Sequence, residues 1–146
     1  MTLASGCTVT GRVTIDMFDR TGARFSRTEV NNTVVESGRT LLARLLAGSS
    51  GTVTHLAIGR GGVSPLAGDT ALGDEVVRVP ATPLPVTTPE TVFRAVLPAG
   101  VGTGALSEVG LFTAPTEGEL FSRAIFPAVT KPPQAVAIIS WTITQS

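Results

Sequence analysis

The stretch Ala105-Leu-Ser-Glu-Val-Gly-Leu-Phe112 places an acid, Glu108, in the middle of an apolar run. It is followed by Glu119-Leu-Phe-Ser-Arg-Ala-Ile-Phe-Pro127 and by Ala135-Val-Ala-Ile-Ile-Ser-Trp-Thr-Ile143. Short apolar runs that are rich in β-branched and aromatic residues and are bounded by Gly and Pro predict strands. Together with Thr91–Leu97, these runs make the C-terminal half a predicted series of strands with little that favours a helix.

The N-terminal half predicts more strands and one helix. Residues Thr8–Phe18 alternate between apolar and polar side chains, and Ala23–Val35 and Thr52–Ile58 also read as strands. The helix is predicted over residues 37–47, with Ser37 as its N-cap and Gly48 as its stop. Its apolar stripe is predicted to be buried and consists of Leu41, Leu42, Leu45 and Leu46.

We therefore predict a single domain over residues 1–146 that is mainly β. Its fold class is an antiparallel β-sandwich of about seven or eight strands, with the one α-helix packed on it. Residues 80–90 contain four prolines, which exclude a helix and a central strand. We expect that segment to be an exposed, extended Pro-rich arm that contacts a partner.

Charge and composition exclude several classes of protein. The 11 basic and 11 acidic residues give a formal net charge of zero, so no basic field is available for nucleic acid. No apolar run is long enough to span a bilayer, and we expect no membrane partner. Charged residues make up only 15% of the chain and the mean hydropathy is +0.34. Such a chain tends to associate, so we expect a homo-oligomer, with a trimer or a ring favoured.

Three blocks of the sequence, taken in order, resemble bacteriophage tail-fibre and tail-collar type domains. The first block runs from Asn32 to Gly48, and the second joins Leu56-Ala-Ile-Gly-Arg-Gly61 to Asp69-Thr-Ala-Leu-Gly-Asp-Glu-Val-Val-Arg78. The third comprises Phe93-Arg-Ala-Val-Leu-Pro98, Ser107-Glu-Val-Gly-Leu-Phe112, Leu120-Phe-Ser-Arg-Ala-Ile-Phe-Pro127, Lys131 and the closing Trp141-Thr-Ile143.

The resemblance implies a structural protein of the virion, located at the tail, baseplate or neck, with other virion proteins as partners and no catalysis. No shaft or receptor-binding tip follows Ser146, so we expect an adaptor module that connects these components to fibres. Two alternatives stay open: a capsid decoration or head-fibre protein, and a host-surface binding module. The absence of Tyr and the single Trp count against the last.

The sharpest polar anomaly is Glu108, which is predicted either to pair with an arginine while buried or to face solvent. The candidate arginines are Arg78, Arg94 and Arg123. If Leu106, Glu108 and Gly110 share one face of their strand, Val109 and Leu111 share the other. Loss of the pairing of a buried acid would cost several kcal/mol.

Glu75 and Arg78 are three residues apart and could pair on a helical turn or find separate partners. We interpret them as a solvated charge cluster or, alternatively, as part of a contact with another subunit that includes the following Pro-rich arm. Trp141 is predicted to lie in the core or an interface. With Arg123 and Lys131, these residues complete our structural or interface candidates.

No catalytic, cofactor-binding or metal-binding residue is predicted, and we expect no enzyme activity and no cofactor. His55 is the only histidine and Cys7 the only cysteine, which argues against a transition-metal site within one chain. Gly59-Arg-Gly-Gly62 lacks the helix that must directly follow a phosphate loop, so we interpret it as a turn.

Overall fold

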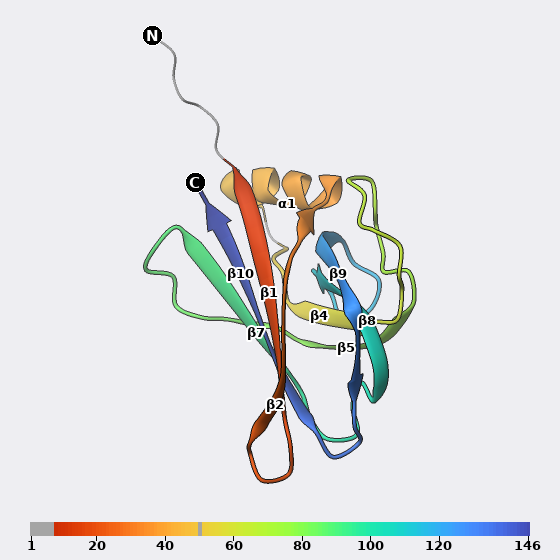
Figure 1. The fold of residues 1–146 in the computed structure, drawn as a ribbon. Coiled ribbons are helices and arrows are strands. Elements are labelled where there is room, and N and C mark those ends of the chain that lie inside the picture. Colours follow the sequence, from red (N-terminus) through yellow and green to blue (C-terminus); the bar gives the residue numbers. More distant parts are fainter. Residues whose placement is uncertain (1–7, 50) are drawn as a thin grey trace.

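The computed structural model describes residues 8–49 and 51–146, which form two five-stranded antiparallel sheets packed face to face and one helix (Figure 1). This confirms the predicted fold class. Within the described residues there are ten strands, and eight of them have five residues or more. The single helix is too short to cross a bilayer.

The first sheet has the strand order β2-β1-β10-β7-β6, and its strands come from both ends of the chain. Their bounds are β1 Val9–Phe18, β2 Arg24–Asn31, β6 Thr82–Pro83, β7 Glu90–Leu97 and β10 Val136–Gln145. The second sheet has the order β3-β9-β8-β4-β5. Its strands are β3 Thr33–Val34, β4 His55–Gly59, β5 Glu75–Pro80, β8 Gly104–Phe112 and β9 Leu120–Lys131.

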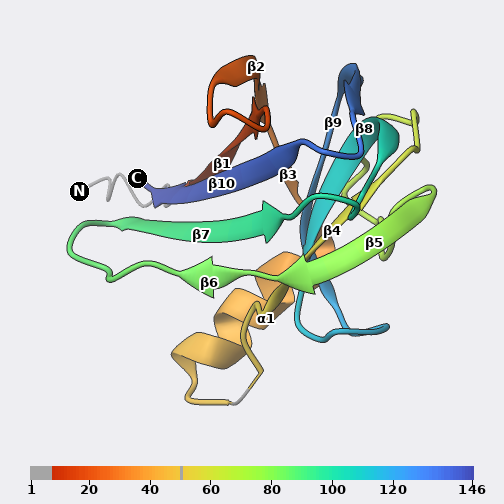
Figure 2. The same ribbon diagram turned by 90° about the horizontal axis from the view of Figure 1, so that it is seen from below.

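The chain passes between the sheets four times within the described residues, and two of these crossings lie at the margins of the sandwich. On one side β2 leads directly into β3, and on the other β5 leads almost straight into β6 (Figure 2). The sheets are therefore joined covalently along both margins. The predicted Pro-rich arm at residues 80–90 begins in this second crossing. Part of it pairs with β7, since Thr82 and Pro83 lie opposite Arg94 and Phe93.

The core lies between the sheets and follows the alternation of the strands. In the first sheet, β1 and β10 place Val13 opposite Trp141 and Ile15 opposite Ile139, and all four side chains are buried. Their neighbours Thr14 and Ser140 lie on the outer face, where they are half-buried. The period-two pattern of β1 therefore predicts its buried face correctly.

Helix α1 spans Glu36–Leu46, one residue earlier than predicted, and lies across one end of the sandwich (Figure 1). Leu41 is buried, and Leu42 and Leu45 pack against the core while partly exposed. The prediction that Leu46 is buried was wrong, because its side chain is 92% exposed. A helix that covers only the end of a sandwich buries a narrower stripe than one lying on a sheet face.

The start of the helix also differs from the prediction. Val35, not Ser37, occupies the N-cap position, and no side chain caps the helix. The hydroxyl of Ser37 instead donates to the carbonyl of Leu120 at 2.5 Å. The backbone N–H of Val35 donates to the carbonyl of Phe121, and a Cβ on Gly38 would collide with that same carbonyl. The helix is therefore held close against β9.

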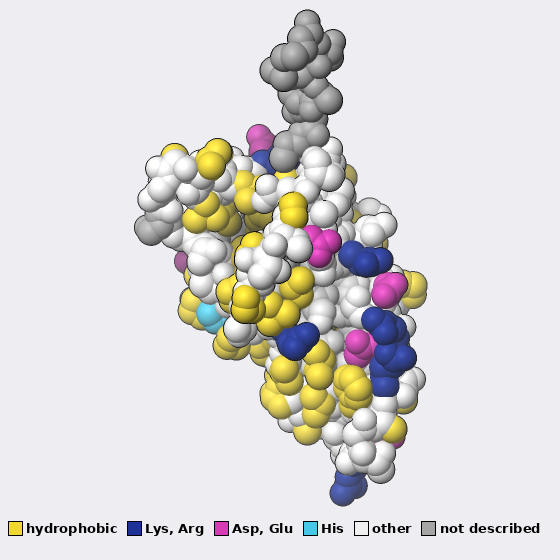
Figure 3. All heavy atoms as spheres, turned by 90° about the vertical axis from the view of Figure 1, so that its left-hand side faces the viewer, with side chains coloured by type: hydrophobic (Ala, Val, Ile, Leu, Met, Phe, Trp, Pro, Cys, Tyr) yellow, Lys and Arg dark blue, Asp and Glu magenta, His cyan; other side chains and the backbone are white. Residues whose placement is uncertain are grey.

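The outer face of the first sheet divides into an apolar half and a charged half (Figure 3). One row across the sheet makes the division clear, because successive pairing places Val96 beside Ile138, Ile138 beside Asp16, and Asp16 beside Arg27. Val96 is 46% exposed. Asp16 lies within 3.7 Å of both Arg24 and Arg27. Val96 is thus open to solvent beside the exposed Arg94 of the same strand, whereas Asp16, Arg24 and Arg27 of the other half pair with one another.

Candidate functional site

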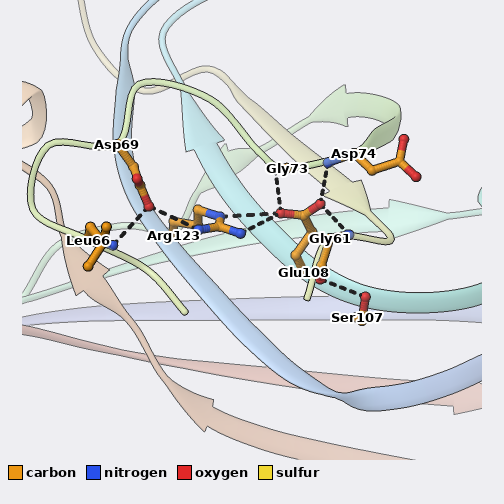
Figure 4. Close-up of polar contacts among 8 residues, drawn as sticks. All are labelled: Gly61, Leu66, Asp69, Gly73, Asp74, Ser107, Glu108 and Arg123. Carbon is orange, nitrogen blue, oxygen red and sulfur yellow. Dashed lines mark hydrogen bonds and ion pairs between the residues drawn. The ribbon is translucent and has the colours of Figure 1, made fainter. Parts of the chain in front are cut away.

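The carboxylate of Glu108 lies on the outer face of the second sheet, yet none of it is exposed. The segment between β4 and β5, which we call the 60–74 loop, folds over it. Three backbone N–H groups of this loop donate to the carboxylate: Gly61 at 2.5 Å, Gly73 at 2.8 Å and Asp74 at 2.7 Å (Figure 4). Glu108 therefore fixes both ends of the loop to β8.

Arg123 of β9 completes the site from the other side (Figure 4). Its Nε and Nη2 donate to Oε1 of Glu108 at 3.2 and 3.0 Å, and its Nη1 donates to Oδ2 of Asp69 at 2.9 Å. That Asp69 oxygen also accepts the backbone N–H of Leu66. Only 3% of the Arg123 side chain is exposed. Of the three arginines predicted as partners of Glu108, the structure thus selects Arg123; Arg94 is exposed on β7.

These donors determine the charge of the acid. Burial alone would raise the pKa of Glu108. The N–H groups of Gly73 and Asp74, the guanidinium of Arg123 and the N–H of Gly61 outweigh burial and hold the pKa below its ordinary value. The site therefore holds an ionised carboxylate on which five hydrogen bonds converge. Such a group stabilises the positions of its donors.

Glycines allow the loop to approach this closely. A Cβ on Gly61 would overlap the carboxylate of Glu108, and a Cβ on Gly59 would overlap the carbonyl of Asp74. On β8, a Cβ on Gly110 would lie 2.8 Å from the side chain of Leu72, which packs down onto the sheet. Leu72 belongs to a small apolar cluster on this outer face, with Val35, Ala57, Phe112 and Leu120. The turn predicted at Gly59–Gly62 is thus the start of the loop that covers Glu108.

Glu108 and Gly110 share the outer face of β8, but Leu106 does not lie on it. Leu106 is fully buried in the main core with Val109 and Leu111. The pairing of β8 with β9 shifts between Leu106 and Glu108, which interrupts the alternation. Ser107, within this irregularity, donates to the carbonyl of Gly61 at 2.8 Å and adds a further bond to the loop.

Glu75 and Arg78 pair with each other, but on strand β5 and not on a helical turn. Residues three apart on a regular strand point to opposite faces. Here the pairing of β4 with β5 shifts by one residue, since Ile58 lies opposite Val77 and Gly59 opposite Glu75. This bulge brings Glu75 onto the face of Arg78, and two bonds of 2.9 and 2.8 Å form between them.

Arg78 also binds the turn of the β8–β9 hairpin. Its Nη1 donates to the carbonyls of Ala114 and Glu117 at 3.0 and 2.7 Å. Its guanidinium lies 3.7 Å from the ring centre of Phe112. The side chain therefore joins β5 to the turn of that hairpin.

Lys131 and Trp141 are both fully buried. Trp141 lies in the main core on β10, between Val13 of β1 and Phe93 of β7. Lys131, at the end of β9, donates to the carbonyl of Pro98 at 3.0 Å. Burial lowers the pKa of this lysine. Lys131 thus ties the end of β9 to the loop between β7 and β8.

His55 lies half-buried on β4, where its Nδ1 is 2.8 Å from the hydroxyl of Thr54. Within the described ranges, no three His, Cys, Asp or Glu side chains gather in a way that would hold a metal ion. Cys7 lies outside the described residues.

The residues that sequence reasoning missed are those of the 60–74 loop. Asp69, Gly61 and Gly73 make direct bonds to the Glu108–Arg123 pair, but none of them is among the predicted site residues, and Gly61 is predicted only as part of a turn. The sequence features that could have identified them are the acid Glu108 within an apolar run and the glycines Gly61 and Gly73 near the two ends of a long loop. No family model, curated protein or solved structure matches this chain.

Proposed function

We propose that this chain is a structural subunit of a tailed bacteriophage or a phage-like particle. It is located in the virion at the tail, baseplate or neck, and it connects these components to fibres. It acts by shape and by contact with neighbouring virion proteins, with no reaction of its own. The proposal starts from the resemblance to tail-fibre and tail-collar type domains.

One observation carries the proposal: the blocks on which that resemblance depends meet in space. Gly61 comes from the Leu56–Gly61 segment, and Gly73 and Asp74 come from the Asp69–Arg78 segment. Their N–H groups converge on Glu108 of the Ser107–Phe112 segment, which pairs with Arg123 of the Leu120–Pro127 segment. Four separated stretches of the pattern therefore form a single structural unit. This supports reading the pattern as that of an architecture and not as a chance succession of short motifs.

The surface gives a second line of support. Hydrophobic side chains gather on part of the outer face of the first sheet (Figure 3). Val96 on this face is 46% exposed and Val86 of the neighbouring arm is 62% exposed, on either side of the exposed Arg94. Exposed apolar side chains that gather on one face are typical of surfaces that contact other proteins. A subunit held between neighbours in a particle would have this surface covered.

The proposal is tested by locating the chain in purified particles. Antibodies raised against the chain would be applied, with a gold label, to particles from a host that carries the gene. The expected result is label at the tail, baseplate or neck, and none on particles from a strain in which the gene is deleted. Label spread over the head would instead identify a capsid decoration or head-fibre protein. Absence of the chain from purified particles, measured by mass spectrometry, would overturn the virion assignment.

The host-surface alternative has its own test. The isolated chain would be applied to host cells and to a glycan array, with heat-denatured chain as a control for correct folding. We expect no saturable binding. Saturable binding that the denatured chain lacks would favour a host-surface binding module over a connecting subunit.

A further inference from the structure

Within the described residues, β2 is the longest outer strand, and it contains no proline and no bulge over most of its length. The other outer strands are β6, which contains Pro83; β5, which has a bulge and ends at Pro80; and β3, which has two residues. The margin of β9 beyond β3 is interrupted by Pro127 and by a shift in register. Proline, bulges, shortness and charged side chains are the usual devices that prevent strands from pairing between molecules.

Strand β2 lacks proline, shortness and bulges over most of its length, and its charged side chains, Arg24, Arg27 and Glu29, are of both signs. It has eight residues and no Pro or Gly, and its pairing with β1 is regular from Asn31 to Ser26. The irregularity between Met17 and Phe18 is confined to the end near the hairpin turn. The outer margin of β2 is therefore a row of free backbone donors and acceptors.

The backbone hydrogen bonds show which residues of β2 face outward. The N–H of Asn32 donates to the carbonyl of Gly11 at 3.0 Å. In an antiparallel pair, hydrogen-bonded and non-hydrogen-bonded pairs alternate. Val30 and Thr28 are therefore bonded to β1, whereas the backbone groups of Arg27 and Glu29 point away from it. The side chains of Arg27 and Glu29 are 48% and 50% exposed.

This alternation limits the ways in which a second copy can pair with β2. In a two-fold antiparallel arrangement, outward residues must lie opposite outward residues. The arrangement can be centred on Arg27, on Thr28 or on Glu29. Centring on Arg27 places the two copies of Arg27 opposite each other, and centring on Glu29 does the same for Glu29. Only the centre at Thr28 places Arg27 opposite the partner's Glu29, and it does so twice. Like charges directly opposite destabilise a sheet, and opposite charges stabilise it.

We propose that β2 pairs with β2 of a second copy of this chain, antiparallel and centred on Thr28. The contact continues the first sheet from one subunit into the next. Because the same strand serves both copies, the contact is isologous and closes as a dimer. It is separate from the trimer or ring predicted from the sequence, and it does not rest on the proposed virion function.

The first test is the mass of the chain in solution. Light scattering across a concentration series is expected to show a shift from the monomer to twice the chain mass of 15.0 kDa. A chain that stays monomeric to about millimolar concentration, or that passes directly to three times the chain mass, would overturn the proposal.

The second test reads the register directly, in a Cys7→Ser background. At a non-hydrogen-bonded pair, opposing Cα atoms are about 4.5 Å apart, which is within the range of a disulfide. Thr28→Cys is therefore expected to form a disulfide-linked dimer on mild oxidation. Glu29→Cys is the matched control, because its two copies lie diagonally at about 7–8 Å. Equal cross-linking of both variants, or of neither, would contradict the register.

The third test exchanges the charges. Arg27→Glu and Glu29→Arg are each expected to weaken dimerisation about tenfold, because two attractive pairs become two repulsive ones. The double variant is expected to restore the wild-type dimer, and an equimolar mixture of the two single variants to form mixed dimers. The unfolding midpoint of each variant shows whether the monomer stays folded. Dimerisation that is unchanged by the single reversals, with the monomer folded, would refute the charge pairing.

Discussion

The substitution Glu108→Gln tests whether the buried carboxylate holds the 60–74 loop in place. The change preserves the shape of the side chain but replaces one acceptor oxygen by a donor NH2 group. Oε2 accepts the N–H groups of Gly61 and Asp74, and Oε1 accepts those of Gly73 and Arg123. Whichever oxygen is replaced, a donor then faces at least two other donors.

The expected loss of stability follows from the buried Arg123, which would lose its partner carboxylate. Arg123 would remain 97% buried with only Asp69 as an acidic partner, at 2.9 Å. Breaking a buried ion pair by removing one partner costs about 3–5 kcal/mol. We therefore expect Glu108→Gln to lower the free energy of unfolding by about 3 kcal/mol or more, which corresponds to a fall of roughly 10 °C in melting temperature.

Urea unfolding followed by the fluorescence of Trp141 measures this change, with Glu90→Gln as the matched control on an exposed acid. Limited proteolysis adds a local readout, because release of the 60–74 loop would expose it to cleavage before the sheets unfold. A loss of less than about 1 kcal/mol, with the loop still protected, would refute the role assigned to Glu108.

The pH dependence of the same variant has a defined sign. The folded-state pKa of Glu108 lies below its ordinary value of 4.5. Its stabilisation is therefore complete above pH 4.5 and is lost as the pH falls through the folded-state pKa. The difference in stability between wild type and Glu108→Gln should shrink in acid. A difference that grew in acid would contradict this reasoning.

Three further predictions concern the other buried side chains. Burial lowers the pKa of Lys131 below its ordinary 10.5, so the stability of the wild type relative to Lys131→Met should rise as the pH is raised toward 10.5, as measured by urea unfolding. The chain has no Tyr and no other Lys to obscure this window. Arg78→Lys should lower the free energy of unfolding by about 1–3 kcal/mol, because lysine cannot reproduce the fork that binds both a carboxylate and two carbonyls. Leu41→Ala should cost about 2–5 kcal/mol, whereas Leu46→Ala, at a side chain that is 92% exposed, should leave the melting temperature nearly unchanged.

The fold class was predictable because the strands carry their own pattern. In β1 the apolar residues alternate over ten residues, and the buried face follows from that alone. The helix was predictable to within one residue, since Gly48 ends the periodic stretch. The burial of Leu46 was not, because periodicity identifies an apolar stripe but does not tell how much of it the neighbouring sheets cover.

The candidate site was predictable only in part, for reasons of register. Glu108 and Arg123 were recognisable as a possible buried pair, but the choice among three arginines depends on two irregularities. One is the shift in β8–β9 beside Glu108, and the other is the bulge in β5 that pairs Arg78 with Glu75. A bulge changes the face of every residue that follows, and nothing in the composition of the strands marks where it falls. The bonds from the loop to Glu108 join residues 34 to 47 positions apart, beyond any local pattern.

Because β1 pairs with β10, the first sheet cannot form completely until β10 has been synthesised. Val9 lies opposite Gln145, so β1, the first of the described strands to be synthesised, has its second neighbour in β10, the last of them. Until then, β1 can form a hairpin with β2 but has no partner on its other side. The barrier to folding should therefore be dominated by the search that brings the two ends of the chain together, and folding should be slow for a protein of this size. In a nascent chain that is stalled before Val136, one margin of β1 would lack its partner strand, and its apolar side chains would be accessible to chaperones.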